Sequence, residues 1–88
     1  MKRRGHLRLI QQAIRNKWPV SLEGRMNALA LVMEVLHDEF ATDRESILAC
    51  QTVVLMETTD IEDDEYNELF AKVKRLGQEI NTLKGFEI

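Results

Sequence analysis

The sequence has little that would interrupt a helix or cross-link the chain. Of its 88 residues one is proline, four are glycine and one is cysteine. A lone Cys50 excludes an intramolecular disulfide and a cysteine-based zinc cluster, and it fits a reducing compartment best. Because leucine, alanine, glutamate, arginine and glutamine are plentiful and breakers are few, we expect an all-α protein of about four helices.

Long apolar runs are also missing. No segment approaches the roughly 20 apolar residues that a membrane-spanning helix needs. The first twenty residues do not resemble a secretory signal peptide, because Arg8 interrupts the apolar residues around it and Gln11 and Gln12 follow. An arginine-rich mitochondrial presequence is a remaining alternative for this segment. We otherwise expect a cytoplasmic protein with no membrane partner.

The residue sets that enzymes use are absent from the sequence. It has no glycine-rich phosphate loop, no paired nucleophile and base, and no spaced set of metal ligands. His6 and His37 are far apart and neither has a second ligand four residues on, so both are predicted to be surface or cap residues. The acidic run at residues 60–65 lacks the glycine and glutamate of a calcium loop; it suits a helix N-terminus or, alternatively, a surface for a basic partner. We therefore expect no catalytic residues, no cofactor and no metal.

Positive charge is concentrated at one end of an acidic chain. Residues 1–25 hold seven basic residues and only Glu23 as an acid, a net charge of +6. Residues 26–71 carry −11 and residues 72–88 carry +2. This distribution indicates a basic binding end on an acidic body.

The basic end is predicted to be a helix from about Gly5 to Lys17, preceded by a mobile basic lead. Leu7, Ile10 and Ile14 recur at helical spacing and form an apolar stripe that ends at Trp18. Pro19 ends the helix, because it disfavours helical geometry for the residue before it. A second line at helical spacing is polar and comprises Arg4, Arg8, Gln12 and Arg15.

This basic helix is the strongest functional signal in the sequence. Lysine and arginine neutralise phosphates and release counterions, and glutamine can reach base edges. Few aromatic residues lie among them, which favours duplex over single-stranded nucleic acid. The residues predicted to contact duplex DNA are Lys2, Arg3, Arg4, Arg8, Gln11, Gln12, Arg15 and Lys17. In a helix-turn-helix the second helix usually reads the groove, but the later helices here are acidic, so the first helix has to dock.

Two capped helices are predicted next. Ser21 is the expected N-cap of the first, which ends near His37 and Asp38. Its apolar face is predicted to comprise Leu22, Met26, Leu29, Met33 and Leu36, broadened by Ala30 and Val32. Thr42 to Glu45 matches a capping box that opens the next helix, and the short linker predicts an antiparallel hairpin. The predicted pattern of that third helix runs through Ile47, Leu48, Gln51, Val54 and Leu55, with Cys50 in the core.

The C-terminal segment has the most regular pattern. A helix opening at Thr59 or Asp60 carries apolar residues at alternating spacings of three and four, namely Tyr66, Leu69, Val73, Leu76, Ile80 and Leu83. As a heptad this places Tyr66, Val73 and Ile80 at a and the leucines at d, which favours a parallel two-stranded coiled coil. Gly77 weakens the pattern by about 1 kcal/mol relative to alanine. These six residues are predicted to join copies of the chain into a homo-oligomer, with packing on the chain's own hairpin as the open alternative.

The sequence therefore predicts a helical DNA-binding and hairpin unit over residues 1–59 and an oligomerisation helix over residues 60–88. The leading function is non-enzymatic duplex DNA binding by an oligomer. A helical structural or protein-interaction module without DNA binding, such as a coiled-coil adaptor, is the alternative.

A resemblance narrows the leading function. Residues 13–19, Ala-Ile-Arg-Asn-Lys-Trp-Pro, resemble an A-I-R-x-x-W-P signature of short phage- and prophage-encoded helical proteins, and the similarity extends over roughly residues 9–57. Some of these proteins look like small subunits of phage terminases, the DNA-recognition component of genome packaging. The resemblance implies a partner large subunit with ATPase and nuclease activities, in the cytoplasm of a bacterial host. The chain departs from the family by being shorter than the usual terminase small subunit.

Overall fold

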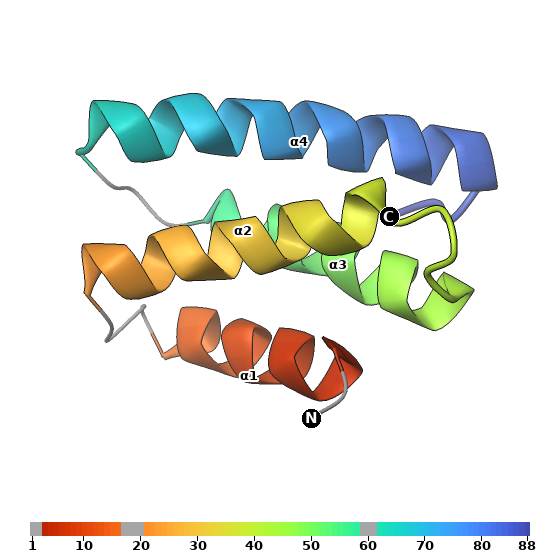
Figure 1. Cartoon of the computed structure of the whole chain (residues 1–88), viewed down its shortest axis with the longest axis horizontal. Coiled ribbons are helices and arrows are strands. Elements are labelled where there is room, and N and C mark those ends of the chain that lie inside the picture. The colour runs from red at the N-terminus through yellow and green to blue at the C-terminus, as the bar shows by residue number, and fades with distance from the viewer. Residues whose placement is uncertain (1–2, 17–20, 59–61) are drawn as a thin grey trace.

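The computed structural model describes residues 3–16, 21–58 and 62–88, and these residues form four helices (Figure 1). The helices are α1 (Arg3–Arg15), α2 (Leu22–His37), α3 (Asp43–Met56) and α4 (Asp64–Lys84). No strand occurs in the part of the chain that the structure describes. The predicted all-α class is confirmed.

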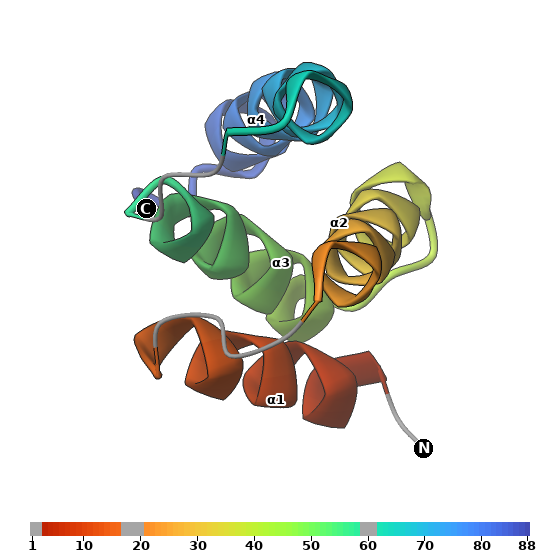
Figure 2. The same cartoon turned by 90° about the vertical axis from the view of Figure 1, so that its left-hand side faces the viewer.

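The helices are arranged in layers, with α2 and α3 in the middle. Figure 2 shows α1 on one side of this pair and α4 on the other. α1 packs mainly against α3, whereas α4 packs against both α2 and α3. Within the described ranges α1 and α4 make no contact with each other. One apolar cluster nevertheless contains residues of all four helices, including Leu7, Leu29, Val53 and Val73.

Helix caps set the ends of the two middle helices as predicted. The Ser21 hydroxyl accepts a hydrogen bond from the Gly24 backbone N–H at 3.2 Å, and Asp38 is the C-cap of α2. At α3 the capping box is complete: the Thr42 hydroxyl accepts from the Glu45 N–H at 3.2 Å, and the Glu45 carboxylate accepts from the Thr42 N–H at 2.9 Å. The linker between these caps is short, and α2 and α3 run in opposite directions (Figure 1).

The ends of α1 and α4 differ from the prediction. α1 begins at Arg3, so Arg3 and Arg4 are helical residues and do not belong to a mobile lead. Leu7 is completely buried, and packing of this side chain holds the first turns of α1 against the core. α1 ends at Arg15, two residues before the predicted Lys17, which lies outside the described residues together with Trp18 and Pro19.

α4 begins later than predicted. Its N-cap is Asp63, whose carboxylate accepts a hydrogen bond from the Tyr66 N–H at 2.8 Å. The predicted caps Thr59 and Asp60 lie outside the described residues, and the helix starts at Asp64. Tyr66 is buried, and its packing fixes where the helix begins, so Asp63, three residues earlier, becomes the N-cap. At the other end Gly85 takes up a left-handed conformation, with φ of 68°, and its N–H bonds to the Asn81 carbonyl.

The buried faces of α2 and α3 match the predicted ones only in part. In α2 the predicted Leu29, Val32 and Leu36 are buried, and Val35 joins them. The other predicted members lie nearer the surface: Ala30 and Leu22 are exposed, and the side chains of Met26 and Met33 are only partly covered. The reason is that α2 packs against all three other helices, so the covered part of its surface is not the single stripe that the spacing predicts.

In α3 the predicted Gln51 and Val54 are exposed, and smaller residues form the core. The buried set comprises Ser46, Ala49, Cys50, Thr52, Val53 and Met56. Because α3 is in contact with all three other helices, it is covered on most sides and small side chains allow the close approach. The prediction that Cys50 belongs to the core is confirmed.

Candidate nucleic-acid interface

α1 has one side in the core and one side in solvent. Leu7 and Ile14 are buried in the core cluster, and Ile10 packs against it. The predicted polar line runs along the helix between its buried side and its solvent side. Arg8, Gln12 and Arg15 of this line are exposed, and Arg4 is partly exposed. The helix carries no acidic residue. The structure therefore brings four of the predicted DNA-contacting residues together on one surface, which we call the basic side of α1 (Arg4, Arg8, Gln12 and Arg15).

Gln11 is not part of this surface. Its side chain is only 6% exposed, and its Nε2 donates to the Leu48 carbonyl at 3.2 Å and to the Thr52 hydroxyl at 3.1 Å. The Thr52 hydroxyl in turn donates to the same carbonyl at 2.6 Å. The predicted role of Gln11 in contacting bases is therefore wrong: its amide joins α1 to α3. The spacing gave a usable signal, since Gln11 lies four residues after Leu7 and three before Ile14, on the apolar stripe itself.

The positive charge of the basic side is not neutralised within the chain. Among the residues that the structure describes, Arg4, Arg8 and Arg15 have no ion-pair partner. Arg4 and Arg15 are eleven positions apart, about 16 Å along the helix axis. Duplex DNA carries one phosphate charge per about 1.7 Å of its axis, so a surface of this length faces several phosphates.

The position of Arg3 and Arg4 adds to the positive electrostatic potential of this part of α1. Both lie in the first turn of α1, where the helix dipole is positive and a basic residue is unfavourable for helix stability. Of the other predicted contacts, Lys2 and Lys17 lie outside the described residues, and Arg3 is placed only by its backbone. The arrangement thus joins backbone N–H groups, a helix N-terminus and arginine side chains in one positive region.

The acidic start of α4 lies away from this region. Asp64, Glu65 and Glu68 belong to α4, which lies across the α2–α3 pair from α1 (Figure 2). A polyanion that approaches the basic side of α1 does not meet the acidic start of α4. These three acids are therefore separated in space from the basic side of α1.

The six predicted oligomerisation residues lie along α4 with very different exposure. Tyr66 and Val73 are buried against the chain's own core, and Leu69, Leu76 and Ile80 pack against it while partly exposed. Leu83 is 79% exposed. A parallel coiled coil that uses both a and d positions would have to remove Tyr66 and Val73 from this core. Self-association through these residues stays a prediction.

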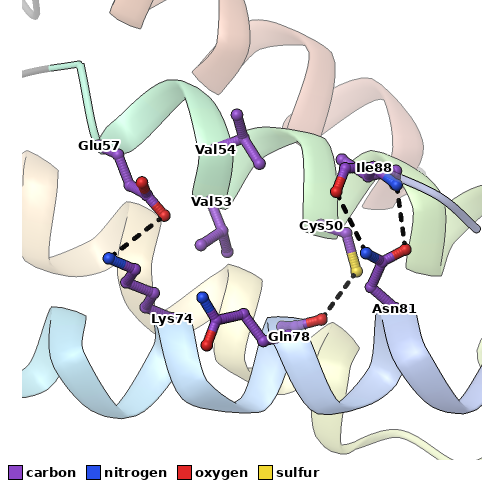
Figure 3. A pocket seen from close by; sticks show the side chains of 9 residues that line it. Cys50, Val53, Val54, Glu57, Lys74, Gln78, Asn81 and Ile88 are labelled. Carbon is purple, nitrogen blue, oxygen red and sulfur yellow. Dashed lines mark hydrogen bonds and ion pairs between the residues drawn. The ribbon is translucent and has the colours of Figure 1, made fainter.

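A small cavity lies between α3 and α4 (Figure 3). Its volume is about 190 Å³, below the 300 Å³ or more that is typical of ligand pockets. At one end Lys74 pairs with Glu57 at 3.7 Å, and at the other Asn81 exchanges two hydrogen bonds of 3.2 Å with the Ile88 backbone. These polar groups satisfy one another, so the cavity is a packing gap bounded by the C-terminal residues.

The remaining candidates for chemistry in the sequence are the single cysteine and the two histidines. The Cys50 thiol donates to the Gly77 carbonyl at 3.6 Å, and burial raises the pKa of this thiol, which disfavours the reactive thiolate. His6 and His37 are exposed, as predicted. The described part of the chain contains no group of three histidine, cysteine or acidic side chains placed to hold a metal ion. Nor does it contain a helix with the length and apolar character required to cross a membrane.

Comparisons with known protein families, curated proteins and solved structures found no match to this chain. The candidate interface therefore rests on the composition and placement of α1.

Proposed function

We propose that the protein binds duplex DNA, without catalysing a reaction, through the basic side of α1. One observation carries the proposal: three arginines without ion-pair partners in the described structure lie on one accessible side of an acid-free helix. Nothing in the fold of α1 requires this charge, since the core contacts of the helix come from Leu7, Gln11 and Ile14. Phosphate neutralisation with release of counterions is the interaction that such a surface favours.

The proposed contacts are mostly to the DNA backbone. Arginine side chains on a helix flank reach phosphates, and Gln12 is the one predicted base-contacting residue that remains at the surface. A protein that uses mainly phosphate contacts binds with weak dependence on DNA sequence and strong dependence on salt. We therefore expect binding to random-sequence duplexes at low salt.

The experiment is a titration of fluorescently labelled duplex DNA at several salt concentrations. We expect the logarithm of the association constant to fall linearly with the logarithm of salt concentration, with a slope of about 0.9 per phosphate contact. Arg4→Ala, Arg8→Ala and Arg15→Ala together should weaken binding and lower that slope by about 3. Arg8→Glu is the most direct single variant, because Arg8 is exposed in the middle of α1.

Lys74→Glu is the matched control. It changes the net charge of the protein by the same amount as Arg8→Glu, but it lies on α4 beside Glu57 of α3, and α4 is across the α2–α3 pair from α1 (Figure 2). A loss of affinity that is equal in Arg8→Glu and Lys74→Glu would reflect net charge alone and would contradict an interface on α1. An absence of binding at low salt would end the proposal.

A narrower form of the proposal makes the protein the small subunit of a phage terminase. It is supported by the resemblance of residues 13–19 and by a basic helix joined to a self-contained helical body. In that role the protein would bind a large subunit with ATPase and nuclease activities. A gene for such a subunit beside the gene of this protein, and co-purification of the two chains, are the expected findings; neither would be found for a DNA-binding protein of another kind.

The alternative function, a helical protein-interaction module, is favoured by a different observation. Phe40 in the α2–α3 linker is 85% exposed and Leu83 is 79% exposed. Large exposed apolar side chains of this kind anchor protein interfaces. The DNA titration separates the two functions, because an interaction module of this acidic composition would show no salt-dependent DNA binding.

A further inference from the structure

Two hollows lie side by side between α2 and α4. The first, of about 250 Å³, is lined by Met26, Leu69 and Lys72, with Glu65 and Glu68 at its edge. The second, of about 230 Å³, is lined by Met33, Leu76 and the same Lys72, with His37, Arg75 and Glu79 around it. Lys72 lines both hollows, so they are neighbours between the same two helices, and we call them together the α2–α4 groove. Its floor is apolar and its edge is charged.

The apolar floor continues beyond the groove along α4. Leu69, Leu76 and Leu83 follow one another at seven-residue spacing; the first two are partly exposed and Leu83 is largely in solvent. On α2 the neighbouring apolar residues are Met26 and Met33, whose flexible side chains adapt to different partners. These are residues whose periodicity predicts a core position but which the chain itself leaves partly uncovered. An extra helix laid into the groove would cover them.

We propose that a second copy of this chain occupies the α2–α4 groove, with the two α4 helices antiparallel about a twofold axis near Leu76. In such a pair, each residue before Leu76 in one copy faces a residue after Leu76 in the other copy, at the same number of positions from Leu76. Leu76 then faces Leu76 of the second copy, and Leu69 faces Leu83 of the second copy. Leu83, the most exposed apolar residue of α4, is thereby covered by Leu69 of the second copy, which is itself partly exposed.

Charge complementarity selects this occupant and this direction. Lys72 lies four positions before Leu76 and Glu79 lies three positions after it, and both are exposed. The antiparallel arrangement therefore places Lys72 beside Glu79 of the second copy, and the twofold axis repeats the pair. A parallel copy in the same register would instead place Lys72 beside Gly77 of the second copy, where it meets no acidic partner, and would leave Lys84 as the partner of Glu79. Lys84, the candidate partner of Glu79 in a parallel pair, already contacts Asp43 of its own chain at 3.5 Å.

The dimer does not depend on DNA binding. The dimer contact is centred on α4, which lies across the α2–α3 pair from α1 (Figure 2), so the contact does not involve the basic side of α1. Failure of one proposal leaves the other in place, because each has its own variants and its own measurement.

The test is the mass of the full chain in solution, by light scattering and sedimentation over a range of concentrations. The wild-type protein should approach the mass of a dimer as concentration rises. Leu83→Asp should remain monomeric, and it should keep its helical circular dichroism spectrum because the side chain is mostly in solvent. Phe40→Asp is the matched control: its side chain is even more exposed but lies in the α2–α3 linker, so the dimer should persist.

A charge exchange tests the direction of the helices without touching the apolar floor. Lys72→Glu should raise the dimer dissociation constant about tenfold, since two attractive pairs become repulsive. Adding Glu79→Lys should restore it, because the exchanged pair is again of opposite charge in an antiparallel dimer. A double variant that stays as weak as Lys72→Glu would contradict the antiparallel register. A wild-type protein that is monomeric at its highest soluble concentration, or a dimer unaffected by Leu83→Asp, would overturn the proposal.

Discussion

Gln11 and Gln12 are neighbours in sequence with opposite environments. Gln11 is buried and hydrogen-bonded to α3, whereas Gln12 is in solvent. Loss of a buried hydrogen-bonding side chain leaves both lost bonds and a void, so we expect Gln11→Ala to lower the free energy of unfolding by about 1–3 kcal/mol. Gln12→Ala should change it by less than about 0.5 kcal/mol. Urea denaturation of the two variants measures the difference, and equal stabilities would show that the contact with Leu48 and Thr52 contributes nothing.

Tyr66 gives the molecule a dependence on alkaline pH. Burial raises the pKa of its phenol, although Arg25 nearby acts in the opposite direction. Because the folded protein keeps this proton at a pH where the unfolded chain has lost it, the stabilisation is complete below pH 10 and is lost as pH rises through the higher folded pKa. Tyr66 is the only tyrosine in the chain, so tyrosinate absorbance follows its titration directly.

The variant Tyr66→Phe isolates this effect. The Tyr66 hydroxyl has no hydrogen-bond partner among the described residues, so removing it should leave stability at pH 7 unchanged or slightly higher. The loss of stability above pH 10 should become shallower in denaturation experiments. An identical alkaline decline in Tyr66→Phe and wild type would assign the decline to other groups.

At the scale of the element, α4 contains a glycine that its helix does not require. Gly77 is buried beside α3, and a Cβ built there would meet the nearest Val53 methyl carbon at 3.5 Å, an ordinary contact. Alanine is favoured over glycine in a helix interior by about 0.8–1 kcal/mol. Gly77→Ala should therefore raise the free energy of unfolding by about 0.5–1 kcal/mol, as read from the urea midpoint. A loss of stability would mean that the approach of α3 and α4 at Cys50 tolerates no added methyl group.

Local signals were sufficient for the elements whose ends are set by their own side chains. Ser21 and Thr42 were recognisable caps, because each bonds to a backbone group three residues on. Asp63 was missed because several acids and Thr59 offer equivalent caps in the same stretch, and the burial of Tyr66 decides among them. Periodicity identified the apolar residues of α2 but not which of them the fold covers.

At the scale of the whole molecule, the layered arrangement keeps the two proposed surfaces apart. α1 and α4 make no contact in the described structure, and the middle layer of α2 and α3 separates them (Figure 2). Arg8→Glu should therefore leave the dimer intact while it weakens DNA binding. A dimer built on α4 would carry two basic sides, one on each copy of α1.

The sequence by itself determined the number and order of the helices, the caps of α2 and α3 and the separation of charge along the chain, because these depend on neighbours a few residues apart. Tertiary structure decided which apolar residues are covered. Gln11 was drawn into the core because Thr52 and Leu48 offer it hydrogen bonds from a helix about forty residues away. Tyr66 and Val73 were taken into the chain's own core, while Leu83 of the same stripe was left largely in solvent. Contacts with distant segments compete for the same helix faces, and the spacing of apolar residues along α2 and α4 does not show which of those residues become covered.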